Sequence, residues 1–234
     1  MNQSEYRLAY QRFQQRYEKK YIPKINRALR NQVKQYIKTQ DINSIDSKEL
    51  YSVLESLYLN TGVNWAKRSL ALSEKAGGLL GFSERIVAFI RLHFAVVIQG
   101  IIQDITDTTK RLIEKVITEA FQNGDSFDDI VKKISSPEFT INRARLIART
   151  ETVSASNVAA LSNAKNSGKR LQKIWISARD SRTRPHHREV NQTTIPLHAK
   201  FTVGRYQMDA PGDKSAGPEE VCNCRCVIAF IPVK

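Results

Sequence analysis

The stretch INRARLIARTETVSASNVAALSNAKNSG, residues 141–168, predicts one long helix with an unusual composition. Thr140 is a suitable residue to open the helix, and Gly168 is a suitable residue to close it. After Arg149 the residues are mostly Ala, Ser, Thr and Asn, so little side-chain bulk faces outward. We therefore expect a helix that neighbouring segments of the chain approach closely.

The segment before this helix is predicted to be entirely helical. No proline occurs between Pro23 and Pro137, and leucine and isoleucine recur at helical spacing. Pro23 itself suits the first turn of a new helix. The first two expected helices cover about residues 4–21 and 23–39, and a third begins at the capping-box pair Asp46 and Glu49. A fourth helix begins at about residue 83, after a break at Gly77, Gly78 and Gly81, and a fifth covers 107–121 and ends at Asn123-Gly124. A short helix capped by Ser126 and Asp129 follows.

The segment after Gly168 is predicted to form a small β-sheet. Leu171–Ala178 alternates and is rich in β-branched and aromatic residues, which favours a strand. A short run at Phe201 and the segment Cys226–Ile231 are two further candidates. The expected fold class is therefore α+β, with a mostly helical N-terminal part followed by a long helix and a small β-sheet C-terminal domain. We place the boundary between residues 1–138 and residues 139–234.

The composition of the 234 residues, 41% hydrophobic and 26% charged, is ordinary for a soluble globular protein. The polar N-terminus has no apolar core of a signal peptide, so no secretory leader is expected. The apolar stretch Ile86–Ile102 is about long enough to cross a bilayer, but it contains Arg91, His93 and Gln99. We therefore expect a buried helix of a bundle and no membrane contact.

The net charge of +14 is concentrated at the two ends of the chain. Residues 1–40 carry a net charge of +8, residues 41–140 carry −3, and residues 141–234 carry +9. This asymmetry favours an anionic partner such as double-stranded DNA bound without sequence preference, although basic helices that are merely solvated remain an alternative. The candidate DNA-binding residues are Arg12, Arg16, Lys19, Lys20, Lys24, Arg27, Arg30 and Lys34.

The three cysteines, Cys222, Cys224 and Cys226, lie within five residues of one another. In an extended segment Cys224 would face away from the other two, unless a turn gathers them. Tetrahedral zinc takes four Cys or His ligands, so the three thiols with His187, or with His186 as a substitute, are a candidate structural zinc site. Reduced thiols packed under the sheet and a disulfide remain open alternatives, and no other cofactor is expected.

The order of short motifs from residue 147 to residue 226 resembles the phage Mu F-like head morphogenesis family. These motifs are IARTET with Asn157, then Gly168, KIWIS, DSRTRPHH, a loop with APGD, and CNCRC. The resemblance covers roughly residues 140–232 and implies a minor head (capsid) protein of a tailed bacteriophage. It also implies a place inside the virion head after assembly in the host cytoplasm, association with the portal protein and other head proteins, and contact with the packaged DNA.

The family patterns match a second set of residues: Arg149, Thr150 and Glu151 in the helix, Asp180, Thr183, Arg184 and His187 in a loop, and Asn223, Cys224, Arg225 and Cys226 near the end. Arg149 and Glu151 lie two residues apart and do not share a helix face. We expect them to form a charged lattice with Asp180 and Arg184 that fixes the helix to the sheet, and we expect no catalytic residue.

The alternative function is that of a metal-dependent nuclease or another DNA-processing enzyme. His186 and His187 near a cysteine cluster could bind a catalytic metal. Against this, no pair of carboxylates lies near these histidines in the sequence. ADP-ribosyl transfer, which fused toxin domains of the resembling family suggest, is disfavoured because the chain contains no Glu-x-Glu motif.

Overall fold

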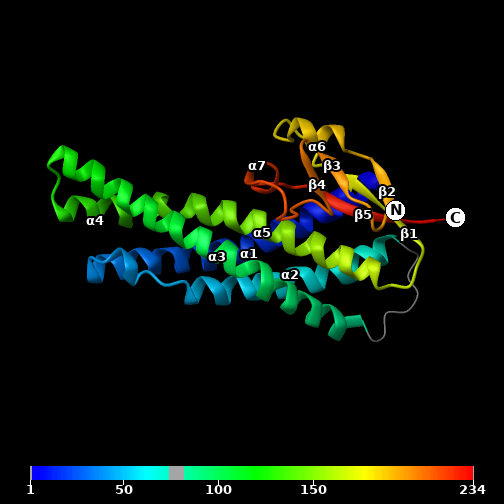
Figure 1. Cartoon of the computed structure of the whole chain (residues 1–234), viewed down its shortest axis with the longest axis horizontal. Coiled ribbons are helices and arrows are strands. Elements are labelled where there is room, and N and C mark those ends of the chain that lie inside the picture. The colour runs from blue at the N-terminus through cyan, green and yellow to red at the C-terminus, as the bar shows by residue number, and fades with distance from the viewer. Residues whose placement is uncertain (1, 74–81, 234) are drawn as a thin grey trace.

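The computed structural model describes residues 2–73 and 82–233 and has long helices along its length with a small β-domain near one end (Figure 1). The helical elements are α1 (Gln3–Thr39), the 3-10 helix η1 (Ile42–Ser44), α2 (Lys48–Ser73), α3 (Phe82–Asn123), α4 (Phe127–Ser135), α5 (Pro137–Lys165), α6 (Pro185–Glu189) and α7 (Pro218–Val221). The strands are β1 (Leu171–Ile176), β2 (Thr194–Pro196), β3 (Phe201–Val203), β4 (Tyr206–Met208) and β5 (Val227–Pro232). This arrangement confirms the predicted α+β fold class.

Helix α1 is continuous, so the prediction of two helices that meet at Pro23 is wrong. Pro23 is exposed, and its missing N–H therefore falls on the solvent side of the helix, where losing one hydrogen bond costs least. A buried stripe continues across the proline and holds the helix on both sides of it. The stripe includes Tyr6, Tyr10, Phe13, Tyr17, Tyr21, Ile25 and Leu29.

Helix α3 is also continuous, although two helices were predicted over this span. Buried residues recur every four positions through Ile98, Ile102 and Thr106, so the packed face runs through the expected break. The helix ends at Asn123, and Gly124 adopts a φ of 70°, as expected for this stop signal. The predicted break at Gly77, Gly78 and Gly81 lies outside the described residues.

One side of α3 is buried in the bundle and the other side is exposed. Ile90, Phe94 and Ile98 are 0–2% exposed, whereas Leu92 and Val96 are 68% and 74% exposed. By length and composition alone, a segment of α3 between Glu84 and Asn123 could cross a membrane, and 28% of this segment is buried. Core helices of soluble proteins share this length and composition. The expectation of a buried helix therefore holds for one face only.

Helix α5 begins at Pro137, three residues before the predicted start, and packs along α1 and α2. Its small residues allow the close approach that the sequence predicts. A Cβ atom added to Gly62 of α2 would lie 3.1 Å from the Cβ of Ala159, and one added to Gly212 would lie 2.9 Å from the Cα of Ser154. Gly212 also has a φ of 80°, which favours glycine.

The central strand of the β-domain is β1, which pairs antiparallel with β2 on one side and with β5 on the other. In the longer pairing, Ile174 lies opposite Ala229. A separate antiparallel hairpin is formed by β3 and β4. The three predicted strands are confirmed as β1, β3 and β5. The sequence prediction missed β2 and β4, each of which is three residues long.

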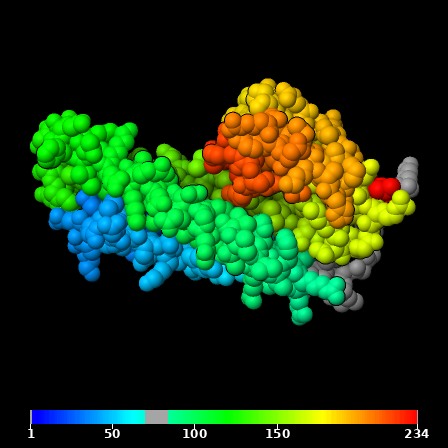
Figure 2. All heavy atoms as spheres, in the orientation of Figure 1, coloured from blue at the N-terminus to red at the C-terminus, as the bar shows by residue number. Residues whose placement is uncertain are grey.

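A single hydrophobic cluster joins the helices to the β-domain and contains Tyr10, Trp65, Ala155, Trp175 and Ile228. Figure 2 shows the β-domain standing out from one side of the helices, and the helical part extends well beyond it. Both chain ends lie at the end of the molecule that carries the β-domain (Figure 1). The core thus includes residues on both sides of position 138, and the division of the chain into two domains there stays a prediction.

Candidate functional site

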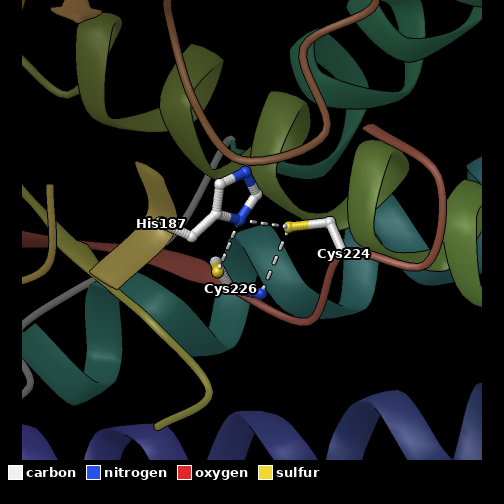
Figure 3. A group of neighbouring side chains, drawn as sticks. All are labelled: His187, Cys224 and Cys226. Carbon is white, nitrogen blue, oxygen red and sulfur yellow. Dashed lines mark hydrogen bonds between the residues drawn. The ribbon is translucent and has the colours of Figure 1, made fainter. Parts of the chain in front are cut away.

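A cluster of one imidazole and two thiols is buried beneath the β-domain (Figure 3). His187 lies in the short helix α6, and Cys224 and Cys226 lie between α7 and β5. The His187 Nδ1 atom is 3.3 Å from the Cys226 Sγ atom and 3.7 Å from the Cys224 Sγ atom. All three residues are only 1–2% exposed. The fold therefore brings together three of the four residues of the predicted metal site.

The fourth predicted ligand, Cys222, lies apart from this cluster, so the expected four-residue set is not assembled. Asn223 adopts a left-handed conformation with a φ of 58°, and this turn directs Cys222 and Cys224 to different sides of the segment. Cys222 borders a pocket of about 540 Å³ that Glu151 and Lys214 also line. The left-handed residue thus lies between Cys222 and the two buried thiols.

The substitute ligand, His186, faces Glu220 instead of the thiols. The Glu220 carboxylate lies 2.7 Å from His186 Nδ1 and 3.0 Å from His187 Nε2. The glutamate side chain is 6% exposed, whereas that of His186 is 48% exposed. Sequence reasoning missed Glu220, because it precedes Cys222 by two residues but follows the histidines by more than thirty. Only the fold supplies these histidines with a carboxylate.

The two buried thiols differ in acidity because they share one hydrogen-bonded arrangement. A hydrogen bond from the Cys226 thiol lowers the pKa of Cys224 well below its ordinary value, and His187 acts in the same direction. Donating to Cys224 raises the pKa of Cys226, and burial adds to this increase. The cluster therefore holds two neighbouring thiols of different acidity, Cys224 being the more acidic.

The Arg-Thr-Glu stretch of α5 makes contacts with three separate parts of the chain. Arg149 forms an ion pair with Glu18 of α1, with a 3.2 Å distance between Nε and Oε1. The Thr150 hydroxyl accepts a hydrogen bond from the backbone N–H of Asn223 at 3.0 Å.

Glu151, whose side chain is 4% exposed, completes these contacts. It accepts hydrogen bonds from the Tyr58 hydroxyl at 2.7 Å and from Lys214 Nζ at 2.8 Å. The three consecutive residues 149–151 thus tie α5 to α1, α2 and the loop before the cysteines.

The loop residues Asp180, Thr183 and Arg184 contact the cysteine segment and each other. Asp180 forms an ion pair with Arg225, and it accepts a hydrogen bond from the Thr183 hydroxyl at 3.1 Å. Arg184 donates to the backbone carbonyl of Cys222. The expected lattice with the α5 residues is therefore replaced by two separate groups of contacts, each of which ends on the segment 222–225.

Asn157 connects α5 to the open edge of β5. Its side-chain amide donates to the Cys226 carbonyl at 3.2 Å and accepts from the Ile228 N–H at 3.0 Å. The Tyr6 hydroxyl of α1 donates to the Ile228 carbonyl at 3.1 Å. Because β5 is an edge strand in a buried position, these side chains replace the missing neighbouring strand.

The candidate DNA-binding residues form a basic stripe on α1. All eight of them are exposed, and successive members are spaced three or four residues apart over much of the helix, which places them on one broad face. Within this stripe, Arg27 forms an ion pair with Glu49, and Lys20 and Lys24 lie over the ring of Tyr21. Arg12 and Lys34 lie about 33 Å apart along the helix, by its rise of about 1.5 Å per residue.

The fold and the site define an α+β protein in which long helices carry a β-domain fastened by side-chain contacts. The chain belongs to the family described as Phage Mu protein F like protein, whose model matches residues 111–229. The match covers α4, α5 and nearly all of the β-domain, including every residue of the thiol–imidazole–carboxylate cluster.

Three curated proteins are similar to parts of the chain. Minor head protein GP7 of Bacillus phage SPP1 is 27% identical over 127 residues, which are 51% of this chain and 40% of that protein. The uncharacterized protein YqbB of Bacillus subtilis (strain 168) is 25% identical over 193 residues, 80% of this chain and 53% of that protein. The NAD(+)--arginine ADP-ribosyltransferase EFV of Enterococcus faecalis (strain ATCC 700802 / V583) is 28% identical over 124 residues, 51% of this chain and 25% of that protein.

The chain therefore spans between a quarter and about half of the length of these relatives. No solved structure matches it.

Proposed function

We propose that this chain is a minor head protein of a tailed bacteriophage that acts by binding other components and not by catalysis. The observation that carries the proposal is the family match over residues 111–229, together with the similarity to a minor head protein of phage SPP1. The matched segment holds a β-domain whose buried polar side chains fasten it to the helices. Such a module suits a protein that must keep its shape within a large assembly.

The basic stripe on α1 is the proposed contact with DNA. Exposed Arg and Lys side chains along about 33 Å of helix can neutralise backbone phosphates without reading base sequence. This length is close to one turn of B-form DNA, about 34 Å. The stripe therefore fits a protein of the head interior that meets packaged double-stranded DNA.

The portal protein and other head proteins are the proposed protein partners, and the virion head, assembled in the host cytoplasm, is the proposed location. A portal partner is tested by co-expressing this chain with the tagged portal protein of the same phage or prophage. We expect the two proteins to remain together through affinity purification and gel filtration at moderate salt. Separation of the two proteins under these conditions would remove the portal from the proposal and leave the other head proteins.

The enzyme alternatives receive less support from the site. The His187–Cys224–Cys226 cluster is almost completely buried, so a nucleic-acid substrate cannot reach it without a change of structure. The similarity to the ADP-ribosyltransferase extends over only 25% of that enzyme. A structural role accounts for the ion pair of Arg149 and for the buried contacts of Glu151 and Asn157 without a reaction.

A further inference from the structure

We propose that His187, Cys224 and Cys226 bind one structural zinc ion, and that Glu220 is the positioning residue that orients the histidine. This inference goes beyond the proposed role in the phage head, because it concerns how the β-domain is fastened and holds for any partner. The three ligand atoms all lie within 4.8 Å of one another. They come from two segments that both follow β1 in the sequence, α6 and the residues just before β5.

The spacing of the ligand atoms fits a zinc ion. With Zn–N bonds of about 2.0–2.1 Å and Zn–S bonds of about 2.3 Å, tetrahedral geometry separates N and S ligands by roughly 3.6 Å. The His187 Nδ1 atom is 3.3 Å and 3.7 Å from the two Sγ atoms, so the observed distances bracket this value. Three converging ligand atoms already surround the position that the ion would take (Figure 3).

The surroundings of the His187 ring also suit a metal ligand. The Glu220 carboxylate lies 3.0 Å from the Nε2 atom, on the side of the ring away from the thiols. The other ring nitrogen, Nδ1, faces the two thiols. A carboxylate behind a histidine ligand is the usual arrangement at zinc sites, where it fixes the tautomer and the orientation of the ring.

The chemistry of the ligands selects the kind of metal and the role. Two thiolates and an imidazole suit zinc, whereas magnesium and calcium prefer oxygen ligands. Because the ligands are only 1–2% exposed, the site joins two segments of the fold and offers no path for a substrate. The remaining coordination position is left for a ligand other than Cys222, which borders a separate pocket.

The test measures the metal content of the full chain. The protein is produced in zinc-supplemented medium, purified without chelator and analysed by inductively coupled plasma mass spectrometry. We expect about one zinc per chain for the natural sequence. Cys224→Ser and Cys226→Ser should each lose most of this zinc, whereas the matched control Cys222→Ser should keep it.

The Glu220→Gln variant tests the positioning role separately. It keeps all three ligands and the size of the side chain but weakens the acceptor behind His187. We expect its zinc affinity, measured by competition with a chromophoric chelator, to fall about 10- to 100-fold. An unchanged affinity would overturn the assignment of Glu220, even with the zinc ion present.

The natural sequence also provides a test that does not depend on variants that fold poorly. After removal of zinc, added Co²⁺ should give the charge-transfer absorption of thiolate–cobalt bonds at one equivalent. A zinc content no higher than that of the buffer, together with three thiols per chain that react in denaturant, would overturn the proposal in favour of hydrogen-bonded free thiols. A zinc content no higher than that of the buffer, together with one reactive thiol per chain, would overturn the proposal in favour of a Cys224–Cys226 disulfide.

Discussion

At the scale of single residues, Asn157 shows how one side chain can replace a strand. It satisfies the Cys226 carbonyl just before β5 and the Ile228 N–H within β5, both of them buried against α5. Unsatisfied buried backbone groups cost about 1–3 kcal/mol each, so the Asn157 amide contributes more to the free energy of unfolding than its small size would indicate. Asn157 therefore contributes to the docking of the whole β-domain.

The Asn157→Ala variant should lower the free energy of unfolding by about 2–4 kcal/mol, because two backbone groups lose their partners in a place that water does not reach. Urea unfolding followed by circular dichroism measures the change. Asn166→Ala at the C-cap of the same helix is the matched control, since Asn166 is exposed and its side chain donates to the Ser162 carbonyl. The control should change stability by less than about 0.5 kcal/mol, and equal effects of the two variants would contradict the role given to Asn157.

Lys173 of β1 is a fully buried cation, and its Nζ donates to the Asp209 carbonyl at 2.8 Å. Burial lowers the pKa of Lys173 from about 10.5 to about 8. Between these values the unfolded chain binds more protons than the folded chain, so stability rises with pH. The stability that depends on an uncharged Lys173 amine is therefore fully present above pH 10.5 and is lost as the pH falls through 8.

We expect the stability of the natural protein, relative to a Lys173→Met variant, to rise between pH 8 and pH 10 by up to about 3 kcal/mol. Urea midpoints of both proteins at several pH values measure this difference, and comparison with the variant cancels the titration of the tyrosines and thiols. Parallel stability curves for the two proteins across this range would show that Lys173 keeps its charge in the folded state.

The residues of the site could be found in the sequence only in part. The clustering of histidines and cysteines indicated His187, Cys224 and Cys226, because ligand residue types are visible without a structure. Glu220 was missed, and Cys222 was grouped with the other two thiols although it lies apart from them, since both outcomes depend on α7 and on the left-handed turn at Asn223. Local backbone geometry of this kind has no signal in composition or periodicity.

At the scale of elements, the contact between α2 and α5 depends on small side chains. An added Cβ at Gly62 would lie 2.8 Å from the Cδ1 atom of Ile90, the end of a flexible side chain of α3. On the α5 side it would lie 3.1 Å from the Cβ of Ala159 and 3.3 Å from the Ala155 carbonyl oxygen. The Ala159 side chain and the Ala155 backbone cannot turn away as a long side chain could. The two helices therefore fit together at this point only because Gly62 has no side chain.

The Gly62→Ala variant should lower the free energy of unfolding by about 1–3 kcal/mol, because the strain of overpacking exceeds the gain in helix propensity. Gly100→Ala is the matched control on α3, where an added Cβ meets nothing within 4 Å. The control should raise stability by about 0.5–1 kcal/mol. Thermal or urea unfolding measures both, and stabilisation by both substitutions would show that the α2–α5 contact tolerates extra volume.

The elements themselves were largely predictable, whereas several of their boundaries were not. Capping residues, helical spacing and β-branched runs located most helices and the strands β1, β3 and β5. The predicted breaks at Pro23 and before Asp107 are wrong, because a buried stripe continues through each of them and tertiary packing outweighs the local signal. Local sequence signals indicate where a helix could end, and tertiary packing determines whether it ends there.

At the scale of the whole molecule, the basic stripe of α1 and the fastened β-domain are separate features. We expect sequence-independent binding to duplex DNA that falls by about 10³ in affinity between 50 and 200 mM salt, as for about six phosphate contacts. Fluorescence anisotropy with duplexes of unrelated sequence measures this affinity.

Supercoiled plasmid incubated with the protein and magnesium should remain intact, as the non-enzymatic proposal requires.

A triple variant with Arg12, Arg16 and Lys19 changed to Gln should lower the salt slope by about 2–3. The control changes Lys67, Arg68 and Lys115 to Gln, which removes the same charge from exposed positions outside the stripe. Equal losses in both variants would mean that net charge alone drives the binding. Affinity that does not change with salt would make the stripe a surface for protein partners.

The most direct test of the central claim is the protein content of purified phage particles. Quantitative mass spectrometry of DNA-filled particles, made by the phage or prophage that encodes this chain, should find it at a few copies per particle. These copies should persist after nuclease treatment and density-gradient purification. Particles that are complete and infectious but contain no peptides of this chain would contradict its assignment as a minor head protein.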